Sequence, residues 1–253
     1  MILKSDSILR KIPSEIGKKQ LLIIDGIRLT VDAIDINFQN LKSHLLNCYK
    51  TGTKQLSSEE VTKLLIISTS IIDFTDKFSK LLSQLDYYRG RNNNKRKEKL
   101  KKITDIKEIV DISRCQEIIL LRNTIQHING NIDKIVSKKD TIFGTLRWVH
   151  ILQKEDSDEH QAISGIITFG KTENYYADFI NPYSVSEGVM IGIDEIEYSL
   201  GDKKMSITWL IVLIKEVCKI LEKEIKSYEL NTTSTAKGDR LMMIDWKKIK
   251  NTI

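Results

Sequence analysis

The chain has 253 residues, 41% of them hydrophobic and 29% charged, and a formal net charge of +6. This length holds one large domain or two small ones with a buried core, and the composition excludes a disordered chain. The most apolar stretch, 207–214, is far shorter than the ~20 residues of a membrane span. Residues 1–4 are followed by polar residues instead of an apolar run, so we expect no signal peptide. We therefore expect a soluble, cytoplasmic protein with no membrane segment.

The cysteines and histidines show no spacing typical of a metal site. Cys48, Cys115 and Cys218 are far apart and form no CxxC pair, and the four histidines are scattered. Glycine is scarce, and neither a Walker loop nor a GxGxxG motif is present. We expect no metal and no cofactor, and free thiols as in a reducing compartment.

Three long helices are predicted in the first half of the chain. The first covers 14–46, where apolar residues recur at helical spacing. The second begins at Ser57-Ser58-Glu59-Glu60, whose hydroxyls and acids favour a helix N-terminus, and continues to near Gly90. The third runs from about Asp105 to Asn129 and ends near Gly130.

The positive charge is concentrated between the second and third helices. Residues 89–102 hold eight bases and one acid, so the rest of the chain is close to neutral. Such a segment can bind RNA by releasing counterions, although most basic runs are solvated loops. The candidate RNA-binding residues are Arg89, Arg91, Lys95, Arg96, Lys97, Lys99, Lys101 and Lys102.

The pattern changes to β-strands after the third helix. Strands are predicted over 145–153, 162–169, 175–180 and 189–198, which are rich in β-branched and aromatic residues. A helix is then predicted over 206–230. The expected fold class is mainly α: a four-helix bundle with a small antiparallel β-sheet inserted before the last helix. We expect one domain over 1–230 with the insertion at about 141–200, and a linker and C-terminal tail over 231–253.

The third predicted helix carries the candidate catalytic residues Arg122, Asn123 and His127. Asn123 lies one turn before His127 on the same face, where the two side chains can hydrogen-bond. Arg122 lies about 140° around the helix from His127, so only its long side chain could reach the same space. A neutral imidazole can take a proton from a ribose 2′-hydroxyl, and a guanidinium can hold the phosphate, which together suit metal-free RNA cleavage.

This helix is also apolar on two sides. Its buried stripe is predicted to be Ile118, Leu121, Ile125, Ile128 and Ile132. Ile119 and Leu120 lie off that stripe, on the side of His127. They predict a second cover, either another helix or a second copy of the chain, which would bring two Arg122–His127 sets into one cleft.

The Arg122-Asn123 pair followed by His127, set in a helical bundle, resembles the HEPN superfamily. Its ribonuclease members carry an arginine, usually followed by a polar residue, and a histidine a few residues later. The resemblance covers roughly 14–133 and 206–230; the sheet has no counterpart in a minimal HEPN bundle. It implies a dimeric, metal-independent endoribonuclease, often of toxin–antitoxin or antiviral defence systems, with a possible separate antitoxin or regulatory partner. One departure is Asn129, where toxins paired with nucleotidyltransferases carry a tyrosine.

Plainer interpretations remain open. Arg122 could pair with an acid while His127 bonds locally, leaving a catalytically inactive HEPN-like module that binds RNA or protein, or a helical scaffold. His44, His150 and His160 are expected at the surface or half-buried. Trp148, Tyr175, Tyr176 and Tyr183 could stack on bases, but aromatic residues in strands more often pack across strands.

Overall fold

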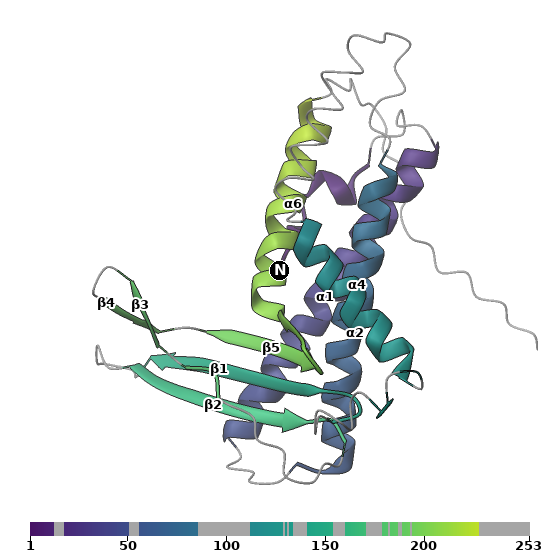
Figure 1. Ribbon diagram of the computed structural model, residues 1–253. Coiled ribbons are helices and arrows are strands. Elements are labelled where there is room, and N and C mark those ends of the chain that lie inside the picture. The colour runs from purple at the N-terminus through teal and green to yellow at the C-terminus, as the bar shows by residue number, and fades with distance from the viewer. Residues whose placement is uncertain are drawn as a thin grey trace, which may run out of the picture.

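Four helices, a four-stranded sheet and a separate two-stranded sheet, β3-β4, make up the part of the chain that the computed structural model describes (Figure 1). That part comprises residues 1–12, 18–50, 56–85, 112–128, 141–153, 160–170, 179–181, 183–186, 189–192 and 194–227, with a few single residues at 130–133. The helices are α1 (Lys18–Lys50), α2 (Ser58–Gln84), α4 (Ile112–Gln126) and α6 (Ile207–Ser227), after a short 3-10 turn, η1 (Ile8–Arg10).

The first two helices pack along each other as predicted. Helix α1 buries Ile24, Ile27, Val31 and Ile34 on one stripe and extends to Lys50, beyond the expected end at 46. Helix α2 begins where the sequence indicates: the Ser57 side chain accepts a hydrogen bond from the Glu60 amide, and the Glu60 carboxylate accepts one from the Ser57 amide. These reciprocal bonds satisfy two amides that the helix leaves unpaired.

Helix α4 crosses α2 obliquely (Figure 1). Ile118 and Leu121 are almost fully buried, and Ile125 and Ile128 pack against the same core. The prediction that Ile132 belongs to this stripe is wrong. Its side chain is 41% exposed, because α4 ends at Gln126 and the stripe does not continue regularly beyond it.

The inserted sheet is antiparallel, with strand order β2-β1-β5-β6. Strands β1 (Thr145–Gln153) and β2 (His160–Thr168) match two predicted strands. The predicted strand over 189–198 is two strands, β4 (Val189–Gly192) and β5 (Glu195–Leu200). Strand β4 pairs with β3 (Tyr183–Ser186), and β5 pairs with β6 (Lys203–Ser206); β3 and β6 were not predicted. Most of the strand predicted over 175–180 lies outside the described residues.

The last helix joins the sheet to the helical core. The Ser206 hydroxyl accepts a hydrogen bond from the Trp209 amide at 2.8 Å, which makes Ser206 the N-cap of α6. The helix therefore begins at Ile207, one residue after the predicted start at 206. Leu210, Ile214 and Val217 of α6 meet Phe78 of α2 and Ile118 of α4 around one small cavity. The predicted helical core with a sheet before its last helix is therefore present. The predicted tail over 231–253 lies outside the described residues.

Candidate functional site

Two of the three predicted catalytic residues are exposed at the C-terminal end of α4. Asn123 lies in the last turn of the helix and His127 directly follows its last residue, and the His127 amide donates to the Asn123 carbonyl at 2.8 Å. Both residues face away from the buried Ile118 and Leu121, as the periodicity of the helix requires. The imidazole is thus accessible from outside the protomer core.

Arg122 lies in a different environment, against α2. Its Nε donates to Asp73 Oδ1 at 2.9 Å and lies 3.2 Å from Asp76 Oδ2. The arginine side chain is 22% exposed and that of Asp76 only 1%. Within the described part of the chain, the hydrogen bonds of this guanidinium involve Nε alone.

Among the described residues, two carboxylates and two cations meet around Arg122. Asp73 and Asp76 are the carboxylates, and Asp76 Oδ2 also accepts a hydrogen bond from Lys80 Nζ at 2.7 Å. The second oxygen of Asp76, Oδ1, is buried and has no hydrogen-bond partner among the described residues. A buried carboxylate with an unused acceptor depends strongly on the cations beside it.

These contacts bear on one part of an alternative left open by the sequence. The expected pairing of Arg122 with an acid is present, and whether the protein is catalytically active stays a prediction. Nothing in one protomer brings the Arg122 guanidinium and the His127 imidazole into a shared contact among the described residues. Asp73 and Asp76 were missed because they lie 46 to 49 positions earlier on another helix, and no local pattern marks them.

The predicted RNA-binding residues all fall in the segment 89–102. Residues 86–111 lie outside the described part of the chain, so the assignment of Arg89, Arg91, Lys95 and their neighbours stays a prediction. In the described residues, no group of three or more His, Cys, Asp and Glu side chains is arranged to hold a metal ion.

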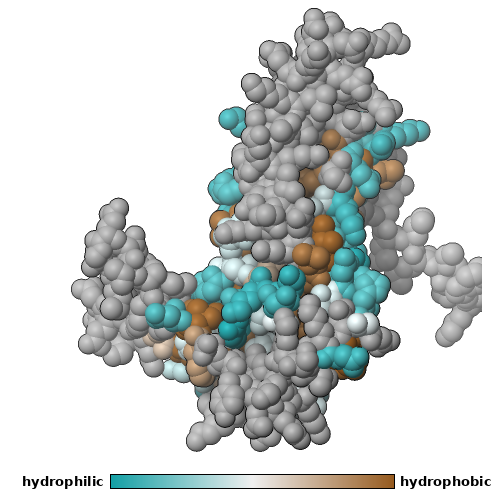
Figure 2. Space-filling model, in the orientation of Figure 1, coloured by the Kyte–Doolittle hydropathy of each residue, from teal (hydrophilic) through white to brown (hydrophobic). Residues whose placement is uncertain are grey.

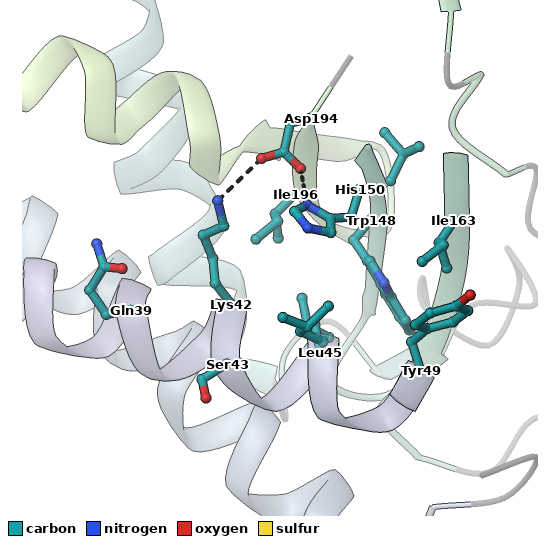
Figure 3. A pocket seen from close by; sticks show the side chains of 12 residues that line it. Gln39, Lys42, Ser43, Leu45, Tyr49, Trp148, His150, Ile163, Asp194 and Ile196 are labelled. Atoms are coloured by element: carbon teal, nitrogen blue, oxygen red, sulfur yellow. Dashed lines mark hydrogen bonds and ion pairs between the residues drawn. The ribbon is translucent and has the colours of Figure 1, made fainter. Parts of the chain in front are cut away.

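A second candidate site, not predicted from the sequence, is a surface cavity of about 300 Å³ between the C-terminal half of α1 and the sheet (Figure 3). Its walls are largely apolar and include two aromatic residues, Tyr49 and Trp148. The Trp148 ring lies over Gly165 of β2, where a Cβ atom would sit only 2.0 Å from Cζ2. Trp148 therefore packs across strands, as expected, and also lines the cavity.

Three polar side chains, from α1, from β1 and from the residue just before β5, meet at one end of this cavity. His150 Nδ1 lies 2.7 Å from Asp194 Oδ1, and Lys42 Nζ lies 3.2 Å from Asp194 Oδ2 (Figure 3). His150 is half-buried, as predicted, but its place in this cluster was not. Lys42 and Asp194 are separated by 152 positions, so no sequence spacing announces the group.

Comparison of the chain with protein-family models, with curated proteins and with solved structures finds no match in any of the three. Among the described residues, no helix combines the length and the apolar character needed to cross a membrane.

Proposed function

We propose that the protein is a metal-independent endoribonuclease of the HEPN type, using Arg122, Asn123 and His127 at a cleft between two copies of the chain. The observation that carries the proposal is the exposed imidazole of His127, one turn from the exposed amide of Asn123, on the helix that also carries Arg122. In this mechanism His127 moves the proton of the 2′-hydroxyl or of the leaving oxygen, and Asn123 orients the ring.

The contacts of Arg122 are compatible with a phosphate-binding role. Asp73 and Asp76 hold the guanidinium through Nε, its inner nitrogen. The two terminal amino groups are the ones that form a bidentate fork with phosphate oxygens. The Asp73 and Asp76 carboxylates then fix the direction in which the terminal amino groups of Arg122 point. They also reduce the net positive charge at this position.

In this proposal, a second copy of the chain brings the Arg122 guanidinium close to His127, which a single protomer does not do. Because Arg122 leans toward α2 and His127 points outward, a composite site requires a twofold axis beside α4. The exposed Leu120 on this helix, 47% accessible, is the apolar contact we assign to that axis. The proposed substrate is RNA, and the basic segment 89–102 is proposed to bind it. The proposed biological context is a toxin or defence system with a separate regulatory partner.

The test is cleavage of single-stranded RNA in EDTA. The wild-type protein is expected to leave 2′,3′-cyclic phosphate or 3′-phosphate ends, and His127→Ala to abolish cutting. Arg122→Lys keeps a cation beside Asp76 but lacks the fork, so cleavage should fall roughly a hundred- to a thousandfold, equivalent to ~3–4 kcal/mol, while the fold is kept. Asn123→Ala should have a milder effect.

His44→Ala is the matched control, because His44 is an exposed histidine on α1. It should cleave like the wild type. Cleavage that requires magnesium, or that survives His127→Ala, contradicts the proposed mechanism. If no RNA is cut but RNA is bound with a steep salt dependence, the alternative of a catalytically inactive HEPN-like RNA-binding module is favoured, with the basic segment as its main element.

A further inference from the structure

The cavity between α1 and the sheet is separate from the proposed nuclease face, since none of its lining residues belongs to α4. We infer that this cavity binds a small molecule with a flat ring at one end and a phosphate group at the other, of the size of a nucleoside monophosphate. The inference stands on the cavity alone and does not depend on RNA cleavage.

One end of the cavity suits a flat ring. Tyr49 and Trp148 lie together there, with Leu45 and Ile163 completing the apolar wall (Figure 3). Trp148 is held in place by its packing over Gly165, so its ring is a preformed surface. Every nucleobase has a π-face that stacks on such side chains, with a gain of roughly 1–3 kcal/mol per base.

The other end suits an anion. Asp194 contacts both Lys42 Nζ and His150 Nδ1 and so places two nitrogen donors beside each other. With Nδ1 engaged, the second ring nitrogen of His150, Nε2, faces the space between Lys42, Leu45 and Ile196 (Figure 3). The Lys42 ammonium and the His150 ring thus offer nitrogen donors to an anionic ligand at this end of the cavity.

The size of the cavity limits the ligand. A volume of about 300 Å³ is at the lower end of the range for small-molecule sites, roughly 300–1,000 Å³. It fits a mononucleotide better than a dinucleotide. The same three polar groups also tie α1 to the sheet, and a purely structural role for them predicts no ligand binding at all.

The experiment measures binding of AMP, adenosine and inorganic phosphate to the full chain by calorimetry, with Trp fluorescence as a second readout. AMP is expected to bind at least tenfold more tightly than adenosine, and phosphate alone more weakly than AMP. Equal affinity for AMP and adenosine, or no AMP binding at millimolar concentration, would overturn the inference.

Two variants separate the two ends of the cavity. Lys42→Gln should weaken AMP about tenfold and leave adenosine unchanged, because it removes the cation proposed to contact the phosphate, together with the ion pair to Asp194. Tyr49→Ala, at a residue 40% exposed, should weaken AMP and adenosine by the same factor, because it removes only ring stacking.

Lys19→Gln, at an exposed lysine of α1, is the charge control and should bind AMP like the wild type. Circular dichroism of each variant establishes that it is folded. An unchanged AMP affinity in folded Lys42→Gln, or a loss as large in Lys19→Gln, would refute the assignment of the site.

Discussion

Glu195, at the start of β5, carries a charge in an unfavourable place. Burial raises the pKa of its carboxyl above the ordinary value of 4.5, the hydrogen bond from Ser206 lowers it, and the neighbouring charges of Glu197 and Asp194 raise it further. The folded protein therefore binds the proton of Glu195 more tightly than the unfolded chain does. The contribution of this proton to the free energy of unfolding is present at low pH and is lost as the pH rises through the raised pKa.

Glu195→Gln should therefore stabilise the protein at neutral pH. The amide oxygen can still accept from Ser206, and no charge is buried. A rise in Tm on the order of 1–3 °C is expected at pH 7.5, shrinking as the pH falls toward 4.5, as measured by thermal unfolding across this range.

Glu216→Gln serves as the control for Glu195→Gln. Glu216 lies on the exposed side of α6 and pairs with Lys219, so losing its charge should not raise Tm. If Glu195→Gln lowers Tm at pH 7.5, the hydrogen bond to the ionised carboxylate outweighs its burial, and the expected sign is wrong.

At the level of secondary-structure elements, the start of β1 depends on a glycine. Gly144 has φ +79°, and a Cβ atom there would lie 2.1 Å from the backbone oxygen of Ser199 on β5. Any side chain would force β1 and β5 apart where they pair, at Thr145 and Ser199. Glycine is required both for its backbone angle and for this close approach.

Gly144→Ala should destabilise the protein by about 3 kcal/mol or more, in urea unfolding followed by circular dichroism. Gly201→Ala is the matched control. Gly201 also has a positive φ, of +64°, but nothing lies within 4 Å of its Cβ position. It should cost only about 1–2 kcal/mol of backbone strain. Equal losses in the two variants would show that the close approach to Ser199 is unimportant.

The elements that the sequence predicted are those with local signals. The start of α2 is encoded in four consecutive residues, and the buried stripe of α1 in a regular spacing. Strand β6 has only four residues, Lys203–Ser206, and forms because the turn at Gly201 returns the chain to β5. Its polar sequence contains no strand pattern of its own, so only the pairing identifies it.

The candidate sites follow the same rule. That Asn123 and His127 share an exposed face could be read from helical periodicity. The pairing of Arg122 with carboxylates on α2 could not be predicted from the sequence. The contacts between Lys42, His150 and Asp194 could not be predicted either. Contacts across the chain depend on how α4 crosses α2 and how the sheet lies against α1, which no single stretch specifies.

At the level of the whole molecule, apolar residues reach the surface in several small groups on the face seen in Figure 2. Among the described residues, α2 and α6 expose one large apolar side chain each, Ile66 and Val212, and α4 exposes Leu120. Helix α1 exposes three, Leu22, Leu29 and Ile36, at intervals of seven residues. We assign the contact between copies to α4, since His127 directly follows this helix.

Leu120→Asp should convert a dimer to a monomer in analytical ultracentrifugation at micromolar concentration, because it puts a charge in the proposed twofold contact. Leu29→Asp, an equally exposed leucine at 49% compared with 47%, should leave the dimer intact. The reverse result would place the contact on α1 and remove the composite nuclease site. A wild-type protein that is monomeric would remove it as well.

The ion pairs of Arg122 also restrict how the sequence can change over generations. Asp76 is 1% exposed, and among the described residues its cationic neighbours are Arg122 and Lys80. Losing the arginine first leaves a buried carboxylate short of a cation, which typically costs ~3–5 kcal/mol. Losing Asp76 first removes that penalty. Positions 73, 76 and 122 are therefore epistatic, and a lineage that abandons Arg122 is expected to neutralise Asp76 before or together with it.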